Sequence, residues 1–151
     1  MYGSAATCAR CGSQNADMAH MFWTCPEAQS QWQAFTNTLT TITGRENLRA
    51  METGLLGLFR RTKVGNAVNR FIDLALLITR RAIAMNWKDG HLPSLSHWFA
   101  ATLKWGKAES VSLSREEACG PSRIPIALEW DTLLHVMEVL SEEYRDAMLD
   151  V

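Results

Sequence analysis

The fold is decided near the N-terminus by residues 8–32, which read CARCGSQNADMAHMFWTCPEAQSQW. This segment holds three cysteines and one histidine with the spacing C-x2-C-x8-H-x4-C, namely Cys8, Cys11, His20 and Cys25. Two thiolates separated by two residues can reach one ion, and Gly12 permits the turn that has to follow them. Zinc accepts thiolate and imidazole together, and four protein ligands leave no position for a reacting water. The segment therefore predicts a structural Zn2+ site that organises the start of the chain.

Other interpretations of the cysteines carry less weight. Cys8 and Cys11 could be ordinary thiols, with His20 buried as an aromatic side chain. A redox-active C-x-x-C is disfavoured because no β-strand precedes it and its neighbours are unlike those of a thioredoxin site. Disulfide pairing is disfavoured because Cys119, the fourth cysteine, is far along the chain and the N-terminus has no secretory signal.

The composition is that of an ordinary globular protein, since 47% of the 151 residues are hydrophobic and 21% are charged. No apolar run reaches the roughly 18 residues that a membrane span needs. We therefore expect an intracellular protein, in the nucleus or the cytoplasm, without a membrane partner. We do not expect an enzyme, because the sequence contains no recognisable nucleophile–base pair, open metal position or phosphate-binding loop.

Beyond the zinc segment the sequence predicts helices throughout. Apolar residues at helical spacing predict helices at about 26–40, 64–87, 95–107, 114–119 and 126–149, with 45–63 irregular or a short helix. Thr24 to Glu27 has a capping-box pattern with Pro26 in the first turn, and Gly44 ends that helix. The expected fold is mainly α, a small Cys3His zinc knuckle followed by a helical bundle. Its expected parts are the knuckle and first helix (1–44), a helical body (45–110) and an acidic helical extension (111–151).

The spacing of the tryptophans and of the apolar residues in the last helix predicts which side chains are buried and which are exposed. Most of the six tryptophans have core spacing, namely Trp23, Trp32, Trp87, Trp98 and Trp130. Trp105, beside Lys104 and Lys107, is instead a candidate surface for stacking on unpaired bases. The apolar seam of the last helix is formed by Ile126, Trp130, Leu133, Met137, Leu140, Tyr144 and Ala147. It could serve a coiled-coil partner, but packing within the same chain is the commoner outcome.

Charge is distributed unevenly along the chain. Residues 1–107 contain 12 Lys and Arg against 6 Asp and Glu, a balance of +6, whereas residues 108–151 contain 3 against 10, a balance of −7. This asymmetry suits a polyanion-binding body with an acidic tail, or two halves that attract each other. If the body binds nucleic acid, the cations expected to neutralise phosphates are Arg10, Arg60, Arg61, Lys63 and Arg81.

The same segment resembles the C-terminal zinc-binding region of LINE-type (non-LTR) retrotransposon reverse transcriptases, which typically reads C-x-x-C-G, then H-x-x-W-x-C and a downstream Trp. The matching positions are Cys8, Cys11, Gly12, His20, Phe22, Trp23, Cys25, Pro26 and Trp32. Weaker similarity continues through LLGL at 55–58, RRAIAMNWK at 80–88 and PSLSHWF at 93–99, with a trace at Glu129 and Trp130. The part after about Ser110 matches poorly and is more acidic than the family leads us to expect.

The resemblance implies a non-catalytic fragment that helps to hold RNA or DNA beside a polymerase. No endonuclease or polymerase segment and no paired catalytic aspartates accompany it in this chain. The expected partner is RNA or other single-stranded nucleic acid, bound weakly and without a base code, and possible further partners include a reverse transcriptase or polymerase domain. The alternatives are a helical scaffold that docks on a protein partner, and a remnant of such an element without a function.

Overall fold

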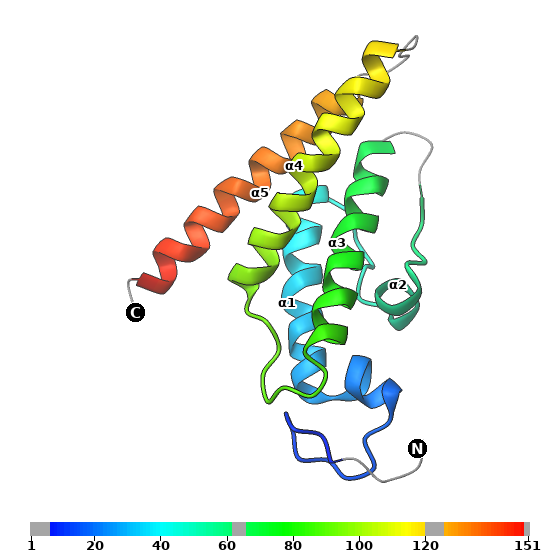
Figure 1. Cartoon of the computed structure of the whole chain (residues 1–151), viewed down its shortest axis with the longest axis vertical. Coiled ribbons are helices and arrows are strands. Elements are labelled where there is room, and N and C mark those ends of the chain that lie inside the picture. The colour runs from blue at the N-terminus through cyan, green and yellow to red at the C-terminus, as the bar shows by residue number, and fades with distance from the viewer. Residues whose placement is uncertain (1–6, 62–65, 120–125, 150–151) are drawn as a thin grey trace.

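The computed structural model describes residues 7–61, 66–119 and 126–149. These ranges contain helices and no strand: the π-helical turn η1 (His20–Thr24) and the α-helices α1 (Pro26–Thr43), α2 (Met51–Leu56), α3 (Asn66–Met85), α4 (Leu95–Cys119) and α5 (Ile126–Leu149). The N-terminal segment lies at one end of the bundle, and α5 runs back along α4 (Figure 1). The predicted fold class, mainly α with a Cys3His knuckle before a helical bundle, is confirmed.

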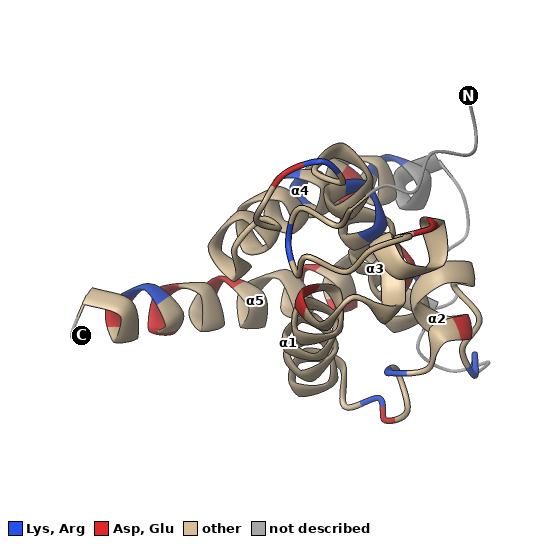
Figure 2. Cartoon of the chain, turned by 90° about the horizontal axis from the view of Figure 1, so that it is seen from below, with Lys and Arg blue, Asp and Glu red and all other residues tan. Residues whose placement is uncertain are grey.

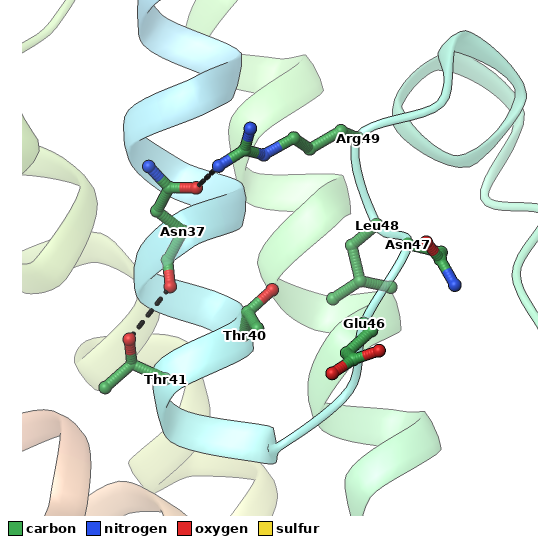
Figure 3. Close-up of a pocket in the computed structure, with 7 residues that line it drawn as sticks. All are labelled: Asn37, Thr40, Thr41, Glu46, Asn47, Leu48 and Arg49. Atoms are coloured by element: carbon green, nitrogen blue, oxygen red, sulfur yellow. Dashed lines mark hydrogen bonds between the residues drawn. The ribbon is translucent and has the colours of Figure 1, made fainter.

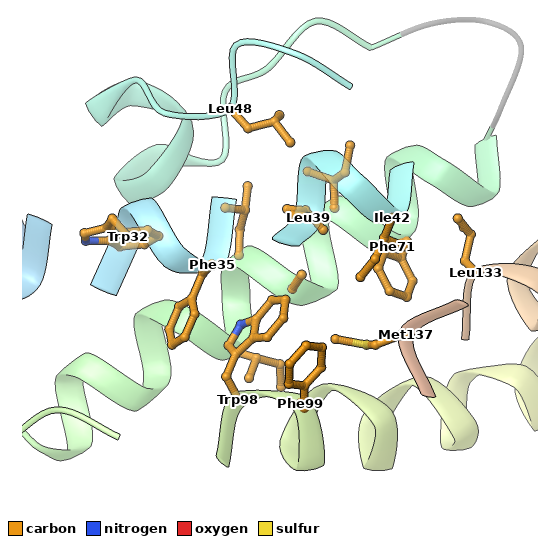
Figure 4. Close-up of a cluster of buried hydrophobic side chains, with 14 of the residues drawn as sticks. Trp32, Phe35, Leu39, Ile42, Leu48, Phe71, Trp98, Phe99, Leu133 and Met137 are labelled. Carbon is orange, nitrogen blue, oxygen red and sulfur yellow. The ribbon is translucent and has the colours of Figure 1, made fainter. Parts of the chain in front are cut away.

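Helix α3 is the centre of the bundle, because it contacts α1, α2, α4 and α5. Aromatic side chains join these helices in the core (Figure 4). The ring of Phe71 on α3 meets Trp130 of α5 edge-on, with 5.6 Å between the centroids. Trp98 of α4 stacks on Phe35 of α1 at 4.9 Å. Burial of these large rings stabilises the packing of all four long helices together.

Helix α1 begins at Pro26 and stops at Gly44, as the sequence predicts, but its N-terminus is capped differently. Gly44 has the left-handed φ of 70° that favours glycine, and its N–H donates to the Thr40 carbonyl at 2.8 Å. The predicted capping box is wrong, because Cys25 is the N-cap and no side chain caps the helix. The Thr24 hydroxyl lies instead 3.4 Å from Nδ1 of His20.

Helix α4 is longer than predicted. The separate helix expected at 114–119 is wrong, because α4 is continuous from Leu95 to Cys119 and passes the boundary expected at residue 110. One contact with α5 comes from the extended part, where the Ser110 hydroxyl donates to the Asp131 carboxylate. Just before it, the indole Nε1 of Trp130 donates to the Gly106 carbonyl at 2.8 Å, and Lys107 forms an ion pair with Glu138 at 2.8 Å.

The tryptophan predictions are mostly confirmed. Trp32, Trp98 and Trp130 are buried and Trp23 is half-buried, whereas Trp105 is 46% exposed, as expected for a surface residue. The core position predicted for Trp87 is wrong, since its side chain is 47% exposed. Helix α3 ends at Met85, so helical spacing no longer applies at residue 87.

The apolar seam of α5 packs within the chain. Leu133 and Met137 are buried, and the Tyr144 ring lies 6.1 Å from that of Phe99. The C-terminal end of α5 extends away from the other helices and carries charged residues (Figures 1 and 2). In the part of the chain that the structure describes, no helix combines the length and apolarity required to cross a membrane.

Candidate metal centre and basic residues

The predicted ligands converge on one point. The Sγ atoms of Cys8, Cys11 and Cys25 and a ring nitrogen of His20 all lie within 4.8 Å of one another. The Cys8 and Cys25 sulfurs are 3.8 Å apart, and Cys11 Sγ is 3.3 Å from His20 Nε2. A tetrahedral ion with metal–sulfur bonds of about 2.3 Å separates two sulfurs by about 3.8 Å and a sulfur from a nitrogen by about 3.5 Å. The four residues can therefore bind a metal ion.

The first two ligands are placed by a tight turn. The Gly12 N–H donates to the Cys8 carbonyl at 2.9 Å, and the Cys8 N–H donates to the Ser13 carbonyl at 2.9 Å. Gly12 has a φ of 78°, which a residue without a Cβ adopts at low energy. This turn points the Cys8 and Cys11 sulfurs to one side, as a metal knuckle requires.

The other two ligands flank the π-helical turn η1. The Cys25 N–H donates to the His20 carbonyl at 2.9 Å, a bond that closes after five residues rather than four. The His20 N–H donates to Oδ1 of Asp17 at 2.8 Å, which fixes the start of the turn. Because Nδ1 of His20 lies beside Thr24, its Nε2 is the nitrogen that faces the sulfurs. The sequence does not predict η1. Single π-helical turns of this kind often occur at functional sites.

Ionisation of the thiols differs across the cluster. Burial opposes ionisation of Cys8, but hydrogen bonds from the N–H groups of Cys11 and Arg10 and from the side chains of His20 and Arg10 outweigh it, so the Cys8 pKa is lowered to about 6. Hydrogen bonding to Ser13 lowers the pKa of Cys11.

The fully buried Cys25 behaves in the opposite way, because burial raises its pKa. Hydrogen bonding to Cys8 raises the pKa of the His20 imidazole. Cys8 is thus prepared to act as a thiolate, whereas Cys25 ionises readily only if a cation lies beside it. A bound metal ion supplies that cation.

Arg10 lies against the cluster. Its Nη2 donates to the Met21 carbonyl, and its Nε and Nη1 are buried without a hydrogen-bond partner. A divalent ion with three thiolates and a neutral imidazole has a net charge of −1, so a guanidinium beside Cys8 suits the loaded site. The structure therefore places Arg10 at the candidate metal centre, whereas Arg61 pairs with Asp73 and Arg81 lines a groove between α3 and α4.

The metal segment is attached to the bundle by aromatic side chains. Trp32 Nε1 donates to the Phe22 carbonyl at 2.7 Å, and the Trp23 and Trp32 rings lie 5.4 Å apart. Trp23 also covers Gly54 of α2 so closely that a Cβ there would lie 2.7 Å from its ring. Order in the metal segment is thereby transmitted to α1 and α2.

Three of the remaining predicted cations, Arg60, Arg61 and Arg81, are described by the structure, and their surroundings differ. Arg61 forms a bidentate ion pair with Asp73, with both N–O distances 2.8 Å, and its guanidinium lies 4.4 Å from the Phe59 ring centroid. This hydrogen bonding raises the pKa of Arg61. Arg60 is exposed, and Lys63 lies outside the described residues.

Arg81 lines a groove between α3 and α4 with a volume of about 330 Å³. Lys104 and Trp105 of α4 line the same groove, as do the exposed Met85 and His97. Trp105 and Lys104 are neighbours in the chain, so their proximity can be predicted from the sequence. The proximity of Arg81 cannot be predicted in this way, because it depends on how α3 packs against α4.

A larger, more polar hollow of about 620 Å³ lies where α1 meets the segment that follows it (Figure 3). Its Arg49 guanidinium donates to the Asn37 side chain, and the Thr41 hydroxyl donates to the Asn37 carbonyl at 3.0 Å. Glu46 is the carboxylate in its lining. Asn37 thus bonds to both Arg49 and Thr41.

The chain matches no family model, no curated protein and no solved structure.

Proposed function

We propose that this chain is a non-catalytic, zinc-stabilised module that binds single-stranded nucleic acid weakly and without a base code. The proposal joins the metal centre to the likeness of residues 8–32 to the C-terminal region of LINE-type reverse transcriptases. In such a setting the chain, as an intracellular protein, would hold RNA beside a polymerase domain. The metal orders the segment around residues 8–25, and cations on the helices neutralise phosphates.

Zinc is the ion that the donor set favours. Three thiolates with one imidazole, in a site with tetrahedral spacing, suit Zn2+ better than Mg2+ or Ca2+, which prefer oxygen ligands. Four protein ligands also close the coordination sphere, which is typical of structural rather than catalytic zinc. Elemental analysis and native mass spectrometry of the purified chain should find one zinc per molecule. A purified chain that contains no zinc and takes up none when zinc is added would contradict this part of the proposal.

The nucleic-acid part rests on one observation, the contrast between paired and unpaired cations. Arg61 pairs with Asp73 and Lys107 with Glu138. Arg81 and Lys104 are exposed and have no acidic partner among the side chains that the structure describes. Exposed cations without internal partners are free to exchange counterions for phosphates.

The test is binding of a fluorescein-labelled oligouridylate by the zinc-loaded chain, followed by fluorescence anisotropy at several salt concentrations. We expect weak binding whose logarithm falls with the logarithm of salt concentration at a slope of roughly −0.7 for each phosphate contacted. A DNA single strand of the same length should bind similarly, because phosphates dominate the contact. Absence of salt-dependent binding to both strands would overturn the proposal.

A protein-docking role is the second candidate, and the projecting end of α5 is the observation that favours it. Met148 and Leu149 are 56% and 82% exposed there, next to charged residues. The seam residues Leu133 and Met137, by contrast, are buried within the chain and cannot serve a partner without unfolding. A docking role would therefore be tested by making Met148 and Leu149 polar, with capture of a recombinant polymerase domain as the measurement.

A further inference from the structure

We infer that the groove between α3 and α4 holds one nucleotide unit of the bound strand. Its base stacks on the Trp105 indole, and the phosphates on either side meet Arg81 and Lys104. This inference rests on the proposed function and assigns the nucleic-acid binding site to this groove. The three side chains come from two helices and line the same groove of about 330 Å³.

Trp105 is distinguished from the other tryptophans by what surrounds it. The indole N–H groups of Trp32, Trp98 and Trp130 all donate to acceptors inside the protein. Trp87 is exposed like Trp105, but the ammonium of Lys88 lies 5.0 Å from its ring centroid.

Among the described residues, no ring or cation lies against Trp105, and its indole N–H has no hydrogen-bond partner. An indole that is 46% exposed and lines a groove offers a free π-face. Unpaired bases stack on such faces regardless of sequence.

The two cations that line the groove come from different helices. Arg81 reaches the groove from α3 and Lys104 from α4, and both are exposed. The neighbouring Arg80 differs, because its Nη1 donates to the Gly54 carbonyl at 3.3 Å on another side of α3. The groove therefore combines two cations from different helices with an aromatic surface, which is the pairing that binds single-stranded nucleic acids.

The size and lining of the groove limit what it accepts. Its volume is near the lower end of the roughly 300–1,000 Å³ typical of ligand pockets, which leaves room for one nucleotide rather than a stacked run. The floor is apolar, with Ile78, Ala82 and Met85 of α3. Asn86 at the edge uses its side-chain N–H2 on the Ala82 carbonyl at 2.8 Å. Few polar groups are left to read a base, so we expect little preference among the four bases.

The experiment compares zinc-loaded variants for binding to labelled oligouridylate at low salt. Trp105→Ala should weaken binding roughly 5- to 150-fold, the range for loss of one stacked base, while Trp105→Phe should retain most of the affinity. The double variant Arg81→Glu/Lys104→Glu should weaken binding and reduce the salt slope by about 1.4, since two phosphate contacts are lost. Trp87→Ala and Arg49→Glu are the matched controls and should stay within about twofold of the wild type.

Three outcomes separate this inference from the proposed function. If the wild type binds RNA but the Trp105 and Arg81/Lys104 variants bind equally well, the groove is not the site and only the inference fails. If the wild type binds no RNA, the proposed function fails as well. If the groove variants instead abolish a self-association seen by sedimentation, the groove receives the acidic end of α5 from a second copy, and the inference is overturned. Zinc content and circular dichroism identify variants that fail to fold, and Trp105→Phe then provides the comparison with Trp105→Ala.

Discussion

Trp98 Nε1 donates a hydrogen bond of 2.9 Å to Oγ1 of Thr79, and both side chains are at most 2% exposed. The same hydroxyl donates to the Ala75 carbonyl at 2.8 Å, so it is both acceptor and donor. Thr79→Val keeps the shape but leaves the buried indole N–H without an acceptor. We expect the free energy of unfolding to fall by about 1–3 kcal/mol, measured by urea denaturation.

The matched control for Thr79→Val is Thr41→Val. The Thr41 hydroxyl is exposed and bonds to the carbonyl four residues earlier in α1. Its removal should change the free energy of unfolding by no more than about 0.5 kcal/mol. Equal effects of the two variants would show that the hydrogen bond between α3 and α4 adds little to stability.

Metal removal should act locally before it acts on the whole bundle. Residues 8–25 have few buried apolar side chains of their own, so a chelator or Cys25→Ser should release the metal and increase hydrogen exchange there first. The core formed by α1, α3, α4 and α5 should remain helical by circular dichroism. Cys119→Ser is the control, because the end of α4 lies at the opposite end of the molecule (Figure 1). Equal metal loss in both variants would contradict the assignment of the ligands.

Arg10 should influence the metal through Cys8. Arg10→Ala removes the guanidinium beside the Cys8 thiolate. We expect metal affinity to fall roughly 10- to 100-fold, which is typical when a residue that contacts a metal ligand, but not the metal, is lost. Arg10→Lys keeps the charge but loses the planar guanidinium, so its metal affinity should lie between those of the wild type and Arg10→Ala. Competition with a chromophoric chelator measures this. Unchanged affinity in Arg10→Ala, with weaker RNA binding, would return Arg10 to the phosphate contacts.

Asp73 should limit the contribution of Arg61 to nucleic-acid binding. Asp73→Asn removes the carboxylate charge and releases the guanidinium, so RNA affinity at low salt should rise roughly two- to fivefold. Stability should change little, because the pair is half exposed, with side-chain exposures of 50% and 44%. Glu142→Gln on the projecting end of α5 removes the same charge elsewhere and should leave affinity nearly unchanged. No difference between the two variants would exclude Arg61 from the binding surface.

Gly106 should be required for the close contact of α4 with α5. A Cβ at this position would lie 2.4 Å from Cδ2 of the buried Leu134. Gly106→Ala gains about 1 kcal/mol in helix propensity, but we expect overpacking of about 1–3 kcal/mol to outweigh it. In the Gly106→Ala background, Leu134→Ala should then destabilise less than it does alone. Additive effects in denaturant unfolding would show that the two residues do not compete for the same space.

The sequence was sufficient to predict that the four candidate metal ligands lie together, because the constraint is local. Four ligands within 18 residues, counted from Cys8 to Cys25, have to meet if they bind one ion. The long helices were predictable for a related reason, since their apolar residues repeat with the helical period. Both signals are present within a single element, and neither depends on how distant elements pack.

The predictions that were wrong concern residues whose local sequence pattern favours one structure while the folded chain gives them another. Thr24 has the position of a capping residue, but its hydroxyl lies beside the imidazole of His20. Ser114 resembles a helix start, yet no Gly or Pro interrupts the chain between residues 107 and 119, and α4 continues through it. The groove could not be predicted at all, because Arg81 and Trp105 meet only after α3 packs on α4.

The π-helical turn between His20 and Cys25 makes the metal centre sensitive to insertions and deletions. Its hydrogen bond spans five residues, one more than an ordinary α-helical turn accommodates. If evolution or design removed one residue between these two ligands, the segment could relax into a regular turn that runs straight into α1. The sulfur of the displaced cysteine would then swing by about 100° around the helix axis, away from Cys8. In related sequences, the length of this spacer should therefore be kept more strictly than the identity of the residues that fill it.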